Sequence, residues 1–173
     1  MTEIASEHEH PGCDGEDASW MRSAIKAGAR GGRDVRPNPK VGCVVVCDGV
    51  LVGEGFHARA GGPHAEVVAL QSAAQRAAGA TLYVTLEPCA HHGRTAPCVD
   101  AIIAAGIARV VVAVVDPHPA AGGGIERLRA AGVEVVVGVE ADSARTLAEI
   151  FLTNVVAGRS HVRLKMAATL DGV

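Results

Sequence analysis

Residues Thr81–Val115 read TLYVTLEPCAHHGRTAPCVDAIIAAGIARVVVAVV, and their pattern decides the fold. The β-branched and aromatic run at Thr81–Thr85 predicts a strand, and the apolar run at Val110–Val115 predicts another. Between them, Cys98–Ala105 has the pattern of a helix. Two strands joined through a helix by short connections form a parallel crossover, so this stretch predicts a helix packed on a parallel sheet.

The same alternation continues on both sides of this unit. Upstream, Asp48-Gly49 separates two β-branched runs, which is a strong signal for a hairpin of antiparallel strands. We therefore expect an α/β fold, a three-layer α/β/α sandwich with a mixed sheet that is antiparallel at the hairpin and parallel after it. The other expected helices are Ser19–Gly28, Ala65–Ala77, Ile125–Ala131 and Ser143–Val156, and the other expected strands are Val41–Cys47, Val50–Phe56, Val133–Val137 and Val162–Lys165.

The 173 residues have the length and composition of one packed domain. An apolar fraction of 49% and a charged fraction of 20% exclude global disorder. Residues 1–17 mix Glu, Asp, His and Gly without periodicity, and we interpret them as a disordered extension. Residues 18–160 are expected to form the domain, and residues 161–173 begin a further strand that the end of the chain truncates.

Charge and aromatic content argue against a nucleic-acid partner. The net charge is −3 and aromatic residues make up 2%, so a basic surface and platforms for base stacking are both scarce. No membrane partner is expected, since the apolar runs fall short of the roughly 18 residues that a membrane span needs. The acidic N-terminus does not resemble a secretory signal, and five cysteines without a disulfide framework indicate free or metal-bound thiols in a reducing cytoplasm.

Reactive side chains gather in His64-Ala65-Glu66 and in two Pro-Cys pairs that end at Cys89 and Cys98. One imidazole and two thiolates are good ligands for Zn²⁺, and three protein ligands leave a fourth position open, as in catalytic zinc sites. Glu66 lies two residues from His64 at a helix start, where a carboxylate can move a proton between water and a leaving amine. Zinc deaminases divide these roles in the same way, although eight residues rather than two separate the cysteines here.

Other interpretations of the histidines and cysteines are open at this point. A closed structural zinc site would need a fourth protein ligand, and His91 and His92 have a spacing that could supply it. Cys43 and Cys47 lie four residues apart on a strand, so their Cα atoms are about 13 Å apart at roughly 3.3 Å per residue. That separation excludes a shared metal or a disulfide, and we expect both residues in the core.

Several stretches of the sequence match one known family: Pro37–Val45, Gly53–His57, Gly62–Val67, Tyr83–Cys98, Val111–Pro119 and Leu164–Gly172. In these stretches the chain resembles the deaminase domain of the bifunctional riboflavin-biosynthesis deaminase/reductase, within the cytidine-deaminase-like superfamily. The block from Leu86 to Cys98, with Gly93-Arg94-Thr95 inside it, is specific to this branch.

The resemblance implies hydrolytic deamination of 2,5-diamino-6-ribosylamino-4(3H)-pyrimidinone 5′-phosphate, a small pyrimidine ribose-phosphate, with release of ammonia. An Asn between two prolines can both donate and accept hydrogen bonds, which suits a pyrimidinone edge, and an Arg can bind a phosphate with two N–H groups. By this resemblance the zinc ligands are His64, Cys89 and Cys98, the proton shuttle is Glu66, and the substrate-binding residues are Asn38, His57, His91, Arg94 and Thr95.

The end of the chain resembles only the opening strand of the family's reductase domain. One strand cannot form a nicotinamide site, so we expect no reductase activity here, and the reductase is either missing or a separate polypeptide. We also expect a homo-oligomer. Two rival functions stay open: a nucleobase or RNA deaminase, which needs a basic and aromatic surface, and a non-catalytic module with structural zinc and no substrate-sized cavity beside it.

Overall fold

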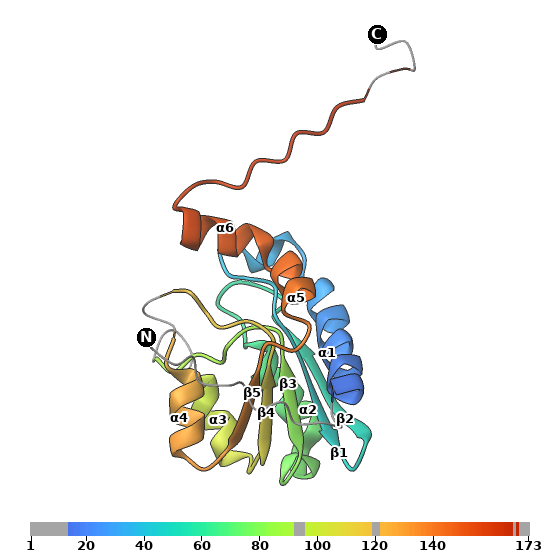
Figure 1. Cartoon of the computed structure of the whole chain (residues 1–173), viewed down its shortest axis with the longest axis vertical. Coiled ribbons are helices and arrows are strands. Elements are labelled where there is room, and N and C mark those ends of the chain that lie inside the picture. Colours follow the sequence, from blue (N-terminus) through green and yellow to red (C-terminus); the bar gives the residue numbers. More distant parts are fainter. Residues whose placement is uncertain (1–13, 92–95, 119–121, 168, 170–173) are drawn as a thin grey trace, which may run out of the picture.

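The computed structural model describes residues 14–91, 96–118, 122–167 and 169. Its five-stranded sheet has the order β2-β1-β3-β4-β5, with β1 antiparallel to both neighbours and β3, β4 and β5 parallel (Figure 1). The strands are β1 (Gly42–Cys47), β2 (Val50–Phe56), β3 (Thr81–Val84), β4 (Arg109–Val112) and β5 (Glu134–Val137). The helices are α1 (Asp14–Ala29), η1 (Arg33–Val35), α2 (Ala65–Ala73), η2 (Ala74–Ala77), α3 (Cys98–Ala104), α4 (Gly124–Ala130), α5 (Ala141–Leu147) and α6 (Glu149–Ala157).

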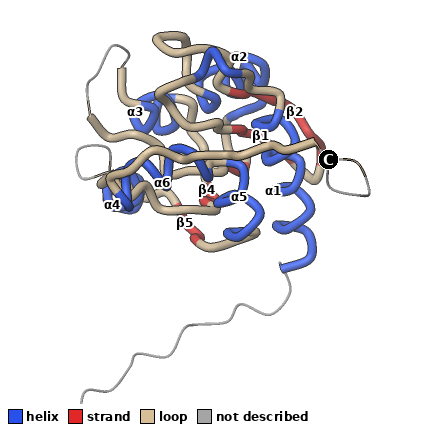
Figure 2. Tube along the Cα trace, turned by 90° about the horizontal axis from the view of Figure 1, so that it is seen from above, coloured by secondary structure: helices blue, strands red, loops and turns tan. Residues whose placement is uncertain are grey.

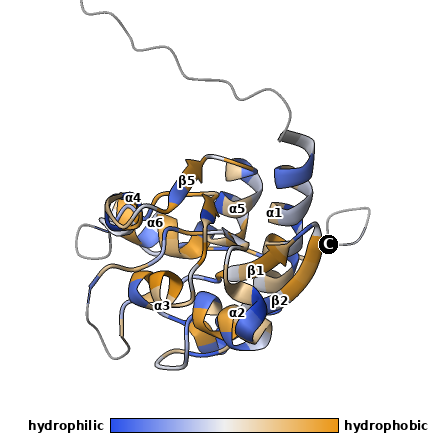
Figure 3. Cartoon of the chain, turned by 90° about the horizontal axis from the view of Figure 1, so that it is seen from below, coloured by the Kyte–Doolittle hydropathy of each residue, from blue (hydrophilic) through white to orange (hydrophobic). Residues whose placement is uncertain are grey.

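Helices cover both faces of this sheet, so the predicted three-layer α/β/α fold with a mixed sheet is confirmed (Figure 2). One buried cluster joins α2, α3 and α4 to strand residues such as Leu82 and Val110. A second cluster joins α1 and α5 to residues such as Val44 and Val111 on the opposite face. The strands are largely hydrophobic while the helices are hydrophobic along one side, as burial between layers requires (Figure 3).

The hairpin between β1 and β2 forms as predicted. Asp48 and Gly49 have φ angles of 51° and 71°, in the left-handed region that two-residue hairpin turns use. At the other end of β1, a Cβ on Gly42 would lie 1.9 Å from the Ala24 carbonyl oxygen of α1. The absence of a side chain at this position therefore lets α1 lie directly on the backbone of β1.

Three of the predicted helices differ from the structure. The helix predicted at Ala65–Ala77 is α2 followed by the 3-10 helix η2, because Ala74 has a φ angle of 51° that ends the α-helix. The first helix begins at Asp14 rather than Ser19, and Asp17 is buried, so residues 14–17 are part of the domain and not of an extension. Residues 1–13 lie outside the described part. The helix predicted at Ser143–Val156 is two helices, α5 and α6, that meet at Ala148. Ala148 is apolar and buried, so the apolar pattern of the sequence continues across the junction and predicts one helix.

The strand predicted at Val162–Lys165 is absent from the described residues, since 161–167 have no regular structure. This segment runs away from the body of the molecule, and no strand of the sheet pairs with it (Figure 1). A strand needs a partner for its backbone hydrogen bonds, and none is within reach here. Among the described helices, none is long and apolar enough to span a membrane.

Candidate active site

A cavity of about 500 Å³ opens at the carboxyl ends of the parallel strands. Its floor includes Leu86 and Glu87 after β3 and Asp116 after β4, and α6 contributes Phe151 and Asn154. This is the edge at which α/β sheets bind their ligands, and the volume lies within the range of small-molecule sites.

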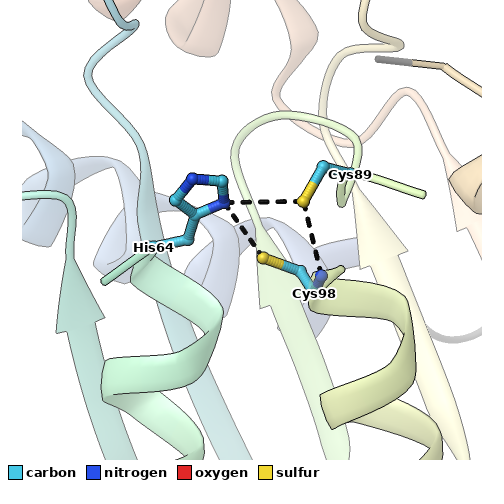
Figure 4. Close-up of side chains that lie close together, drawn as sticks. All are labelled: His64, Cys89 and Cys98. Carbon is cyan, nitrogen blue, oxygen red and sulfur yellow. Dashed lines mark hydrogen bonds between the residues drawn. The ribbon is translucent and has the colours of Figure 1, made fainter. Parts of the chain in front are cut away.

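The side chains of His64, Cys89 and Cys98 meet at one side of this cavity (Figure 4). His64 immediately precedes α2, Cys98 begins α3, and Cys89 lies beyond the end of β3. The Nδ1 atom of His64 lies 3.1 Å from Cys98 Sγ and 3.6 Å from Cys89 Sγ. The Cys98 backbone N–H donates to Cys89 Sγ over 3.3 Å, so the first turn of α3 also holds the other cysteine.

This donor set fits a Zn²⁺ ion. One imidazole nitrogen and two sulfurs are preferred zinc ligands, and all three donor atoms lie within 4.8 Å of one another. Donors at zinc bond lengths around a tetrahedral ion would be about 3.5 Å apart, close to the two measured nitrogen–sulfur distances. His91, considered above as a fourth ligand, does not belong to this group of donors, and His92 lies outside the described residues.

The three donors shift one another's pKa values. Hydrogen bonds from the Cys98 thiol and from His64 lower the pKa of Cys89 to about 4. The Cys89 thiolate accepts these bonds and so raises the pKa of Cys98 and of His64 above their ordinary values. Without a cation, the second thiolate is disfavoured beside the first. A divalent metal would remove that penalty and release the remaining proton.

Glu66 lies in the first turn of α2 and lines the same cavity. Its side chain is 3% exposed, and burial raises the pKa of its carboxyl above the ordinary value. The carboxyl interacts with the Cys98 thiol but is not one of the three converging donors. Glu66 is thus a buried acid beside the three converging donors and at the wall of the same cavity.

Asn38 and His57 act as a pair. The amide nitrogen of Asn38 lies 3.1 Å from His57 Nε2, and His57 Nδ1 lies 3.0 Å from the Pro63 carbonyl oxygen. The carbonyl can only accept, so Nδ1 carries the proton and Nε2 accepts from the Asn38 amide. His57 is buried and lines the cavity with Asn38. Both of its nitrogens are occupied by protein, so its chemistry is to orient Asn38.

Of the other three predicted substrate-binding residues, the structure describes only His91. His91 is exposed and lines the cavity. Arg94 and Thr95 lie outside the described residues, so their predicted contacts stay predictions. Cys43 is fully buried in the core, as predicted, whereas Cys47 is only partly buried and packs against the core from its edge.

Sequence reasoning missed the contribution of α6 to the cavity. Phe151, Asn154 and Val155 follow the i, i+3, i+4 spacing of one helix face and all line it. That spacing could have identified a face, but an apolar face that covers a cavity has the same pattern as one that covers a core.

The comparisons with known proteins agree with this geometry. The chain belongs to the family described as the cytidine and deoxycytidylate deaminase zinc-binding region, whose model matches residues 14–114. Membership of the cytidine-deaminase-like superfamily is therefore confirmed.

Individual relatives are more specific. The chain is 52% identical over 158 residues to the riboflavin biosynthesis protein RibD of Escherichia coli, covering 91% of this chain and 43% of that protein. The structure of Acinetobacter baumannii RibD superposes with a TM-score of 0.87 and 51% identity over 91% of this chain and 45% of that one. A Thermotoga maritima diaminohydroxyphosphoribosylaminopyrimidine deaminase/5-amino-6-(5-phosphoribosylamino)uracil reductase superposes with a TM-score of 0.89 and 47% identity, over 93% and 47%. The chain thus spans less than half the length of these relatives.

Proposed function

We propose that this chain binds Zn²⁺ through His64, Cys89 and Cys98 and hydrolytically deaminates 2,5-diamino-6-ribosylamino-4(3H)-pyrimidinone 5′-phosphate. The observation that carries the proposal is the convergence of the three donors beside the buried Glu66 on a substrate-sized cavity. The activity for which the Thermotoga maritima relative is named supports this choice of substrate. The chain matches less than half the length of these relatives, so the proposal concerns the deaminase reaction alone.

Glu66 moves the proton in the proposed reaction. The oxygen of water bonds to the ring carbon that carries the amine, the carbon–nitrogen bond breaks, and ammonia leaves. Glu66 takes one proton from the water and delivers it to the departing amine, for which its raised pKa suits it. The second proton of the water ends on the adjacent ring nitrogen, and the ring carbon becomes a carbonyl. A bound Zn²⁺ supplies the Lewis acidity that makes water a nucleophile near neutral pH.

Asn38 orients the pyrimidine in this proposal. Its amide N–H is held by His57, and within the described residues its carbonyl oxygen Oδ1 has no protein partner. An acceptor held in place at the cavity wall can bind an amino group of the substrate. His57 is then a positioning residue that fixes the amide, and His91, Arg94 and Thr95 stay proposed contacts of the pyrimidine or the ribose phosphate.

Glu66→Gln tests the mechanism. The amide cannot carry the proton, so we expect turnover to fall by at least about 100-fold, the usual contribution of general acid–base catalysis, with zinc content unchanged. Ammonia release and elemental analysis measure the two quantities. Glu126→Gln, at an exposed residue in the first turn of α4, is the matched control. A Glu66→Gln enzyme with a near-normal rate would remove Glu66 from the mechanism.

Cys98→Ser tests the metal site. A serine hydroxyl is a much poorer zinc ligand than a thiolate, so the purified variant is expected to lose zinc, and unchanged zinc content would refute the assignment. Substrate choice is tested separately by comparing ammonia release from the diaminopyrimidinone phosphate with release from cytidine and guanine. Faster ammonia release from cytidine or guanine would favour a nucleobase or RNA deaminase instead.

A further inference from the structure

Helix α4 supplies none of the zinc donors, yet its contacts end on the two segments that carry Cys89 and Cys98. It packs beside α3 and next to β5 (Figure 3). Three separate contacts connect its first turns to the chain around the cysteines.

The first contact is made by Glu87, two residues before Cys89. Its buried carboxylate accepts backbone N–H bonds from Gly124 at 2.8 Å and Ile125 at 3.1 Å through Oε1, and from Asp116 at 3.1 Å through Oε2. Both oxygens are thus used on backbone groups. Glu87 lines the cavity, but its hydrogen bonds make it a tie between the end of β3 and the start of α4.

The second contact is a close approach of backbone to backbone. A Cβ built on Gly124 would lie 1.9 Å from the Pro88 carbonyl oxygen. No side chain fits between them. The first residue of α4 therefore lies directly against the residue that precedes Cys89.

The third contact is made by Arg127. Its Nη1 donates to the Ala90 carbonyl oxygen at 3.0 Å, and its Nη2 donates to Asp100 Oδ1 at 2.5 Å. Ala90 directly follows Cys89, and Asp100 lies two residues after Cys98. One guanidinium thus bridges the two segments that carry the sulfur donors, and its planar fork can hold two acceptors at once.

We propose that α4 acts as a clamp that sets the separation of Cys89 and Cys98 before the metal binds, with Glu87 and Arg127 as positioning residues. The inference rests on the proposed zinc function. Donors that are already in place lose little conformational freedom when the ion arrives, so the clamp strengthens zinc binding. Arg127 and Asp100 are about half exposed, so their ion pair contributes little to folding stability, and the expected effect is on metal affinity.

The test compares Arg127→Gln, Arg127→Lys and Arg129→Gln with the wild-type chain. Arg129 is the matched control because it lies on the same helix and donates to the Val135 carbonyl oxygen, away from the cysteines. Zinc affinity is measured on metal-stripped protein by competition with a chromophoric chelator. Melting temperature without metal and the visible spectrum with Co²⁺ report stability and ligand geometry.

We expect Arg127→Gln to weaken zinc binding about tenfold, with little change in the melting temperature of the metal-free protein. Arg127→Lys should not restore affinity, because one ammonium cannot bridge two acceptors in a fixed geometry. Arg129→Gln should match wild type. Equal zinc affinity in Arg127→Gln and wild type, or full rescue by Arg127→Lys, would overturn the clamp while leaving the zinc site intact. A wild-type chain without stoichiometric zinc would overturn the proposed function together with the clamp.

Discussion

Few polar or charged side chains are buried among the described residues. The groups that each of them bonds to indicate whether it stabilises the fold or belongs to the candidate site. Asp17, Thr85 and Glu87 have hydrogen bonds to partners in the scaffold, and His57 is held by Asn38 and Pro63. Glu66 differs, because it faces the cavity and the Cys98 thiol. Its carboxyl bonds to the backbone at the start of α2 and to the Cys98 thiol, so it is the buried acid whose contacts lie at the site of the proposed proton transfer.

Among these buried residues, Asp17 stabilises the fold through both hydrogen bonds and an ion pair. Both of its oxygens accept from Arg109 at 2.8 Å, and Tyr83 Oη donates to it at 2.8 Å. These contacts connect α1 to β3 and β4. They also hold the pKa of Asp17 below its ordinary value of 3.8, with the Arg109 hydrogen bonds as the main cause.

Asp17→Asn should lower the free energy of unfolding by about 3 kcal/mol at pH 7, because it breaks a buried ion pair. The lowered pKa means that the carboxylate stabilises the fold above pH 3.8 and loses this effect as pH falls through its folded-state pKa. The difference between wild type and variant should therefore shrink below pH 3.8. Urea unfolding at pH 7 and pH 3 measures it, and Asp142→Asn, whose side chain is fully exposed, is the control. A difference that does not depend on pH would contradict the role of the charge.

Among the elements, α1 and α6 connect differently to the sheet. Helix α1 lies on β1 with no side chain between Gly42 and the backbone of Ala24. Helix α6 has no buried residue, although it is strongly apolar, because its Phe151 packs only at the edge of the second core cluster and its inner face lines the cavity. Close packing on the sheet therefore positions α1, whereas α6 forms part of the cavity wall.

Gly42→Ala should reduce the free energy of unfolding by about 3 kcal/mol, since its Cβ has no space and α1 must shift. Gly15→Ala should act in the opposite direction, by about 0.5 kcal/mol, because Gly15 lies in the same helix with nothing within 4 Å of a new Cβ. Thermal and urea unfolding of both variants provide the comparison. Equal stability of the two would show that α1 does not need the close contact.

Asn154→Ala tests whether α6 contacts the substrate. Asn154 lines the cavity, and the loss of one neutral hydrogen bond of about 1 kcal/mol should raise KM about fivefold and leave kcat unchanged. Thr153→Ala, one residue away on α6 and not part of the cavity wall, is the control. Steady-state ammonia release gives both constants. If both variants have the KM of wild type, Asn154 lines the cavity without a hydrogen bond to the substrate.

Considering the whole molecule, the segment after α6 stands apart from the domain. Val162, Leu164 and Met166 are 84%, 81% and 79% exposed, and they alternate as in a strand that faces an apolar surface on one side. The segment extends away from the sheet and its helices (Figure 1). Its contact with the body includes an exposed ion pair between Arg163 and Glu149 at 3.4 Å.

Removal of residues 161–173 should leave the domain intact. The described part of this segment buries no apolar side chain, and an exposed ion pair contributes little, so the melting temperature should change by about 1 °C. Differential scanning calorimetry and zinc content of the shortened chain are the measurements. A large fall in melting temperature would mean that this segment packs against the domain in solution.

The sequence by itself determined the layers of the fold and the residue types of the candidate metal site. Hydrophobic residues that alternate along a strand or recur along one helix face form local patterns. Such patterns predict the hairpin, the parallel strands and most of the helices without any tertiary contact. The residue types at His64, Glu66, Cys89 and Cys98 likewise indicated zinc and proton transfer from chemistry alone.

Only the tertiary structure decided which distant segments meet. It placed α6 over the cavity, fixed His57 between the Pro63 carbonyl oxygen and the Asn38 amide, and brought α4 against the cysteine segments. It also extended α1 back to Asp14, where the buried contact of Asp17 with Arg109 compensates for an N-terminal sequence without helical periodicity. Such contacts join residues far apart in the chain, and their energy depends on packing geometry, which a local pattern does not contain.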